Sequence, residues 1–222
     1  MSIFRKSYLV FMCIIGILLF SGCSNKQTPV EKMYEVLEKV VSTEKAFEDQ
    51  QVPLVELEKK EKGIYDHIIS LGMKEFEEIT KLSNEASVIV GKRKKHMDIE
   101  QESIEASKAE FQTLSAIIEE VEEPLLKEKS LELYDIMMER YNIHNDLYQH
   151  YSNALKLDKG LYEMFKKEDL QLEQLENQIS KINEEYAKVL EANEMFNEKT
   201  NQYNETKLSF YKEAGLEIKT KK

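Results

Sequence analysis

The sequence lacks tryptophan altogether and has only three prolines and seven glycines among its 222 residues. So few turn-forming residues, and no sustained alternation of apolar and polar side chains, argue against a fold of many short strands. Glutamate, lysine, leucine, asparagine and glutamine dominate instead, and these residues form helices or cover their solvated faces. The composition therefore predicts an all-α protein.

Cysteine is also scarce, and basic residues are outnumbered by acidic ones. The chain has 31 lysines and arginines against 42 acidic residues, a net charge of −11 at pH 7. A surface this acidic repels nucleic acid and anionic lipid headgroups, so neither is expected as a partner. Of the two cysteines, Cys13 lies in a segment that we expect to be removed, which leaves Cys23 alone. An intrachain disulfide is then impossible, and stability must come from packing.

The N-terminal segment has the parts of an export signal. Arg5 and Lys6 supply positive charge, and residues 8–20 form an apolar run. This run is too short to anchor a chain stably across a bilayer, which takes about 20 residues. We therefore expect residues 1–22 to be a signal peptide that is removed. A retained membrane helix is one alternative.

A lipidation motif ends this segment. Leu19-Phe20-Ser21-Gly22-Cys23 resembles the bacterial lipobox, in which small residues precede a cysteine, although Phe20 stands where leucine is most common. By this resemblance the signal is cleaved after Gly22, and Cys23 carries a covalent diacylglycerol, the only cofactor-like group expected. Two or more acyl chains hold a protein stably on a membrane. An ordinary signal peptide with an incidental cysteine is the other alternative.

The first helix has a clear start signal. Thr28 and Glu31 have the spacing of a capping box, and Pro29 occupies the first helical position, where its missing N–H costs nothing. Residues 23–28 then form a short linker between the lipid and the helix. Because proline interrupts a helix interior, we expect a break over residues 49–52, just before Pro53.

Apolar spacing, glycine and proline place three further helices. The predicted helices cover residues 53–90, 98–157 and 161–214, with kinks at Gly63 and Gly72, a kink or short break at Pro124, and ends at Gly91, Gly160 and Gly215. Short connections between long helices force antiparallel neighbours. The sequence therefore predicts one elongated up-and-down bundle of about four long helices over residues 29–215, followed by a basic tail at 216–222.

Several of these features occur together in one known family. The lipobox, the Thr28-Pro29 helix start, the long helices rich in Glu, Lys and Asn, and the length of the chain resemble the YkyA-like cell-wall-binding lipoproteins of low-GC Gram-positive bacteria. The resemblance implies an all-α bundle at the outer cell surface that associates with the wall. It supplies no catalytic or binding residues.

Signatures of catalysis and metal binding are absent from the sequence. It contains no Glu-x-x-His, His-Glu-x-x-His, phosphate-binding glycine loop or Gly-x-Ser-x-Gly elbow. His144 and His150 are six residues apart, about 240° around a helix, so they cannot share a ligand. All four histidines, which include His67 and His96, are expected to be surface or helix-seam residues. We therefore expect neither an enzyme nor a metal site.

Two sets of residues are candidates for wall binding. Tyr134, Tyr141, Tyr148 and Tyr151 follow a spacing of three and four residues that places them on one helix face with His144. Their rings could stack on glycan faces, with hydroxyls making hydrogen bonds. The alternative, which heptad placement favours, is that the rings fill the core of the bundle.

The second set is the basic cluster Lys92, Arg93, Lys94 and Lys95. After Gly91 it could form a compact basic tip that contacts teichoic acid, a polyanion, in a manner that salt would weaken. The alternative is a solvated turn whose cations complement the carbonyl end of a helix.

The sequence therefore predicts a non-enzymatic lipoprotein on the outer face of the cell membrane, beneath or within the wall. Its expected partners are the membrane, through the lipid, and either peptidoglycan, teichoic acid or another envelope protein, for which it could act as a spacer or scaffold. A solute-binding or transporter-associated lipoprotein with a groove between helices is the alternative function, and self-association is a third possibility.

Overall fold

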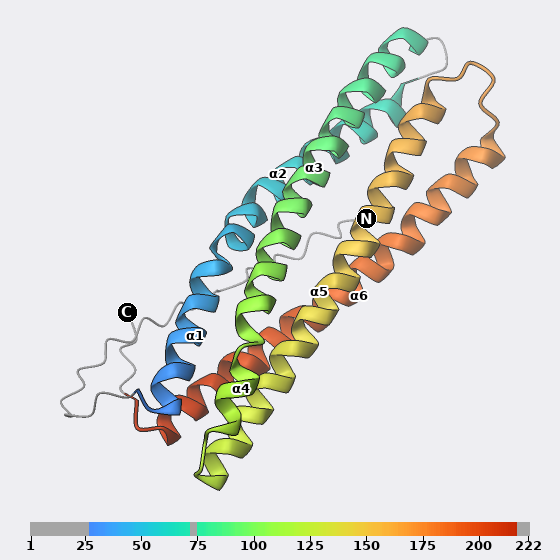
Figure 1. Ribbon diagram of the computed structural model, residues 1–222. Helices are drawn as coiled ribbons and strands as arrows, with labels where there is room; N and C mark the ends of the chain where they lie inside the picture. The colour runs from blue at the N-terminus through green and yellow to red at the C-terminus, as the bar shows by residue number, and fades with distance from the viewer. Residues whose placement is uncertain (1–26, 72–74, 217–222) are drawn as a thin grey trace. The chain divides into compact units, whose positions relative to one another are not determined.

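The computed structural model describes residues 27–71 and 75–216 (Figure 1). These residues contain helices and no strand, which confirms the predicted all-α class. The predicted signal peptide, Cys23 and all but the first residue of the predicted basic tail lie outside the described residues. The six helices are α1 (Pro29–Thr43), α2 (Lys45–Ser70), α3 (Phe76–Phe111), α4 (Leu114–Glu119), α5 (Pro124–Phe165) and α6 (Leu172–Glu213).

The helix start at Thr28 is confirmed atom by atom. The backbone N of Thr28 donates to Oε2 of Glu31 at 2.6 Å, and the backbone N of Glu31 donates to Oγ1 of Thr28 at 3.3 Å. This reciprocal pair satisfies two amides that no helical carbonyl can reach. Pro124 similarly begins α5, after a break in the predicted place. None of these helices carries an apolar stretch that could cross a membrane.

The predicted break before Pro53 is wrong. Pro53 lies inside α2, and the chain turns instead at Glu44, between α1 and α2. Proline removes one helical hydrogen bond, but Phe47 and Leu54, on either side of it, are both buried. Tertiary burial of an apolar face commonly outweighs the local preference of one residue.

The predicted helix ends at Gly91 and Gly160 are also wrong, because α3 and α5 continue through them. Gly160 allows a close approach of two helices. A Cβ at this position would lie 3.1 Å from Nε2 of Gln178 on α6, and that amide donates to the carbonyl of Leu157 at 2.7 Å. The small residue is therefore a packing feature of α5.

The predicted end at Gly215 is confirmed. Gly215 has a φ of 68°, a left-handed conformation that only glycine adopts without strain. Its amide and that of Leu216 donate to carbonyls in the last turn of α6, which caps the helix.

The predicted helix 53–90 is divided between α2 and α3, and the predicted kink at Gly72 lies outside the described residues. The predicted helix 98–157 is divided among α3, α4 and α5, with an unpredicted interruption at residues 112–113, and the predicted helix 161–214 is shortened to α6 because α5 continues to Phe165.

The chain divides into two compact units, where the sequence predicted one domain over residues 29–215. Unit 1 contains residues 27–43, 107–140 and 196–216, and unit 2 contains Glu44–Ala106 and Tyr141–Met195. Helices α3, α5 and α6 contribute residues to both units. In unit 1, α1, α4 and parts of these three helices bury apolar side chains that include Met33, Leu37, Phe111, Leu133 and Phe210.

Unit 2 is an up-and-down arrangement of four helical segments. Hydrogen bonds join α2 to α3, α3 to α5 and the residue that follows it, and α5 to α6 (Figure 1). In each pair, a residue later in one helix is bonded to a residue earlier in the other. Each neighbouring pair is therefore antiparallel, as the short connections predicted. The apolar core runs between them and includes Leu54, Ile68, Ile89, Leu155 and Val189.

Candidate functional site

The centre of unit 2 holds a buried arginine. Arg93 on α3 is only 4% exposed. Its guanidinium donates to Oε2 of Glu61 on α2 at 2.8 Å and lies 3.4 Å from Oδ2 of Asp158 on α5. It also donates to the hydroxyls of Tyr151 on α5 and Tyr186 on α6, each at 2.9 Å. One side chain thus contacts the three other helices of its unit.

Tyrosine hydroxyls extend this network. Tyr151 donates to Oε1 of Glu58 at 2.6 Å, and Tyr162 donates to Oε1 of Glu61 at 3.1 Å. Tyr186 donates to Oδ2 of Asp158 at 2.5 Å. Burial raises the pKa of all three tyrosines, which keeps their hydroxyls protonated as donors. Each carboxylate therefore has a donor besides the arginine, as buried charges require.

The network contains more carboxyl groups than cations. Burial, and secondarily the charge of Glu61, raises the pKa of Asp158 to about 7. Glu100, a nearby buried residue on α3, has its pKa raised to about 8 by burial and by the charge of Glu58. No group of three or more His, Cys, Asp or Glu side chains within residues 27–71 and 75–216 could hold a metal ion. The raised pKa values of Asp158 and Glu100 favour the protonated, neutral form of these two buried acids.

The burial of Arg93 corrects the predicted basic tip. Residues 92–95 lie inside α3, so they do not follow a helix end, and only Lys92 and Lys95 are exposed. The sequence did carry a signal for Arg93. Buried residues of α3 recur at Val90, Arg93 and Met97, with the three-and-four spacing of a core-facing stripe, and Arg93 takes a core position in it.

The four candidate tyrosines do not share one surface. Tyr141 is 1% exposed and Tyr151 is 6% exposed, so neither ring can stack on a glycan where it lies. Tyr134, in unit 1, is half-buried and stacks on Phe111 with ring centroids 5.6 Å apart. The core placement that the heptad favoured is therefore the observed one for Tyr141 and Tyr151. Tyr148 is half-buried at the surface of unit 2.

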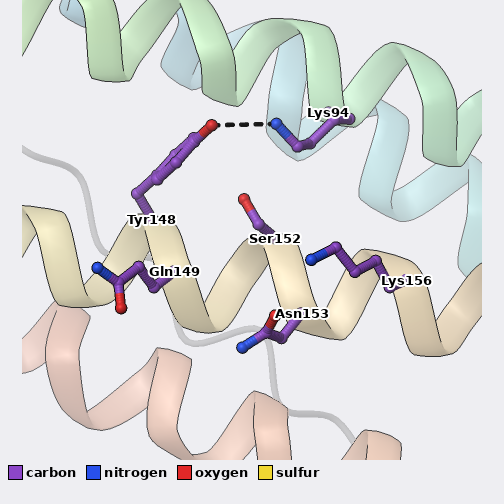
Figure 2. Close-up of a pocket in the computed structure, with 6 residues that line it drawn as sticks. All are labelled: Lys94, Tyr148, Gln149, Ser152, Asn153 and Lys156. Atoms are coloured by element: carbon purple, nitrogen blue, oxygen red, sulfur yellow. Dashed lines mark hydrogen bonds between the residues drawn. The ribbon is translucent and has the colours of Figure 1, made fainter.

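Tyr148 and Lys94 come together, although the sequence placed them in different candidate sets. Both are anchored by Asp98, whose Oδ1 accepts from the Tyr148 hydroxyl at 2.7 Å and also from the Lys94 ammonium. The ammonium donates to the Tyr148 hydroxyl at 3.1 Å and lies 5.0 Å from the centre of its ring (Figure 2). This three-residue arrangement holds an aromatic ring and a cation in fixed positions at the surface.

A surface pocket of about 320 Å³ opens beside this arrangement. Its lining consists of donor-rich side chains from α3 and α5: Lys94, Tyr148, Gln149, Ser152, Asn153 and Lys156 (Figure 2). Two ammonium groups, two amides and two hydroxyls line it, and no carboxylate does. On a chain of net charge −11, such a lining selects for ligands rich in acceptor oxygens, either anionic groups or hydroxyls.

The pocket and the buried network use adjacent residues. Arg93 directly precedes Lys94 on α3, and Tyr151 directly precedes Ser152 on α5. Successive residues of a helix point about 100° apart, so a helix that turns one residue inward presents the next one at its flank. By fixing the rotation of α3 and α5, the bonds of Arg93 also fix where the pocket residues lie.

Comparison with known proteins gives three matches. Residues 28–213 match the YkyA family, described as "Putative cell-wall binding lipoprotein". The chain is 37% identical over 202 residues to "Uncharacterized lipoprotein YkyA" of Bacillus subtilis (strain 168), covering 91% of this chain and 90% of that protein. A crystal structure of a conserved protein of unknown function from Staphylococcus aureus matches with a TM-score of 0.71 and 17% identity, over 85% of this chain and 98% of that one. The last likeness shows the fold alone.

Replacing Arg93 tests the importance of the buried network. Arg93→Met leaves the buried carboxyls of α2 and α5 without their cation, so we expect a loss of roughly 3–5 kcal/mol in the free energy of unfolding. Lys92→Met, at the exposed neighbouring position, is the matched control and should change it by less than about 0.5 kcal/mol. Urea denaturation followed by circular dichroism measures both. Equal effects of the two substitutions would contradict the network's role.

The raised pKa values predict a pH dependence of stability. Asp158 and Glu100 have ordinary pKa values of 3.8 and 4.5, raised in the fold to about 7 and about 8. At a pH between its unfolded and folded pKa values, each group keeps a proton in the folded state that it has released in the unfolded chain. Both groups therefore make the free energy of unfolding fall as pH rises from about 4 to about 8. Glu100→Gln mimics the protonated acid and should flatten the fall, measured as melting temperature at pH 5, 6, 7 and 8.

Glu102→Gln, at an exposed position of the same helix, is the control for that measurement and should keep the parent's slope. A Glu100→Gln protein as pH-sensitive as the parent would show that Glu100 is ionised in the fold.

Proposed function

The chain belongs to the YkyA family of lipoproteins, and from that membership we propose that a lipid on Cys23 holds it at the outer face of the cell membrane, where unit 2 binds cell-wall polymer. The lipobox at residues 19–23 supports the anchor. The description of the family supports the wall as the partner. The pocket on unit 2 supplies the surface through which binding occurs.

One observation carries the proposal. The pocket brings Lys94 and Tyr148 together, and Asp98 holds both in place. Glycan strands offer hydroxyl-rich, partly apolar faces to an aromatic ring, and teichoic acids offer phosphates to a cation. A fixed ring beside a fixed cation suits a polymer that carries either group. Because Asp98 already orders both side chains, little further entropy is lost when a ligand binds them.

The chemistry of the lining favours binding over catalysis. No histidine, cysteine or carboxylate lines the pocket, so it lacks the groups that most often serve as general acid or base. Asp98, just outside the lining, is engaged by Lys94 and Tyr148, and these bonds lower its pKa although partial burial opposes them. A carboxylate kept ionised in this way is a positioning group.

The proposal is tested by co-sedimentation of the lipoprotein, extracted in mild detergent, with purified cell-wall sacculi that carry or lack teichoic acid. We expect retention by the wall. The double variant Lys94→Gln with Lys156→Gln should weaken it about tenfold, because two donors to ligand oxygens are lost. Lys159→Gln with Lys181→Gln removes the same charge from exposed positions of unit 2 outside the pocket and should leave retention unchanged.

The contents of the wall and the salt concentration then separate the possible ligands. Retention on sacculi stripped of teichoic acid would indicate glycan contact, whereas retention lost with teichoic acid or with salt would indicate phosphate contact. The circular dichroism spectrum of each variant should match that of the parent. No retention under any condition would overturn wall binding and favour a membrane-tethered spacer or scaffold for another envelope protein.

A further inference from the structure

The pocket contains a hydroxyl whose hydrogen-bonding capacity is unused. Ser152 is 8% exposed, and its Oγ has no hydrogen-bond partner. A buried helical serine or threonine usually donates to the carbonyl four residues earlier. Ser130 does so to Leu126 at 2.7 Å, and Thr200 does so to Phe196 at 2.8 Å. Ser152 does not, and an unmet buried hydroxyl is costly unless another group satisfies it.

The position of this hydroxyl points to a ligand. Ser83 and Ser87 on α3 also have unpartnered hydroxyls, but neither lines this pocket. Ser152 does line it, and Figure 2 shows its oxygen directed toward Tyr148 and Lys94, with the Lys156 side chain on the other side of the serine. The group that would satisfy Ser152 therefore enters from the pocket.

Lys156 provides an uncompensated cation at the same place. Some lysines of unit 2 have carboxylate partners, such as Lys166 with Glu163 and Lys188 with Glu185. Others, such as Lys159, have none within the described part of the chain and lie outside the pocket. Lys156 is exposed and forms no ion pair with any residue that the structure describes. Its side chain extends back along α5 toward Ser152 (Figure 2). Since Asp98 already balances the charge of Lys94, the pocket has one positive charge without a partner.

We propose that Ser152 and Lys156 form an anion subsite that binds one phosphate group, with Lys94 at its far edge. The proposal rests on the proposed function and names the part of the polymer that the pocket recognises. The oxygens of a tetrahedral phosphate accept hydrogen bonds from several directions at once. This suits the hydroxyl of Ser152 and the ammonium of Lys156, both on α5, together with the ammonium of Lys94 on α3. A phosphodiester carries a single negative charge, which equals the unpaired charge of the pocket.

The subsite is tested by calorimetric titration of the detergent-extracted full-length lipoprotein with three probes: glycerophosphoglycerol, inorganic phosphate and glycerol. We expect the phosphodiester to bind and glycerol, which has the same hydroxyls without the charge, not to bind. Ser152→Ala and Lys156→Gln should each weaken the phosphodiester about tenfold. The matched controls Ser180→Ala and Lys159→Gln, both at exposed positions of unit 2, should bind as the parent does.

Loss of folding cannot explain the expected result for Ser152→Ala. The hydroxyl makes no hydrogen bond in the free protein, so its removal breaks none, and the melting temperature should stay equal to the parent's or rise. Binding by Ser152→Ala at the parent's affinity, or no binding of either phosphate probe by the parent, would overturn the subsite. Inorganic phosphate bound more tightly than the diester would support the subsite and assign it to free phosphate.

Failure of the subsite and failure of the proposed function give different results. A protein that the wall retains but that binds neither phosphate probe would keep the proposed function and lose the subsite. A protein that binds the phosphodiester but is not retained by sacculi would keep the subsite and lose wall binding.

Discussion

The guanidinium of Arg93 is the interaction on which the rest of unit 2 depends. It donates to side chains on α2, α5 and α6, so the rotation of every helix in the unit is tied to one group. Burying a cation with several carboxyls is expensive, and an apolar core of the same volume could be as stable. Directional hydrogen bonds, however, accept only one register of the helices, which apolar packing alone specifies less strictly.

The surface pocket follows from this interior. On α3 and α5, the residue that directly follows a network residue lines the pocket: Lys94 follows Arg93, and Ser152 follows Tyr151. Asp98, which lies one turn after Lys94 on α3, then holds both Lys94 and Tyr148 of α5 in place. A rigid core thus supports a donor-rich surface on an otherwise acidic chain.

The sequence predicted features that depend on neighbouring residues alone. The capping box at Thr28, the interruption at Pro124 and the glycine end at Gly215 were predicted correctly, because local backbone chemistry decides them. The continuation of helices through Pro53 and Gly91 was not predicted, because burial of side chains distant in the sequence outweighs local propensity there.

The candidate site was predicted only in part, for a related reason. Tyr148 and Lys94 were each selected by residue type, but their meeting depends on α3 and α5 lying antiparallel, which no local pattern fixes. Arg93 was assigned to the surface because of its charge, although its spacing matched the core. The unpartnered hydroxyl of Ser152 is visible only in three dimensions, since a serine in a helix ordinarily bonds to its own backbone.

Hydrogen–deuterium exchange of the lipoprotein, with and without purified cell wall, tests the central claim that the wall binds at the surface which Arg93 positions. The account predicts slower exchange on wall binding in two segments of unit 2, residues 92–98 of α3 and 148–156 of α5, with little change in unit 1. Protection confined to unit 1, or to faces of unit 2 remote from the pocket, would contradict it.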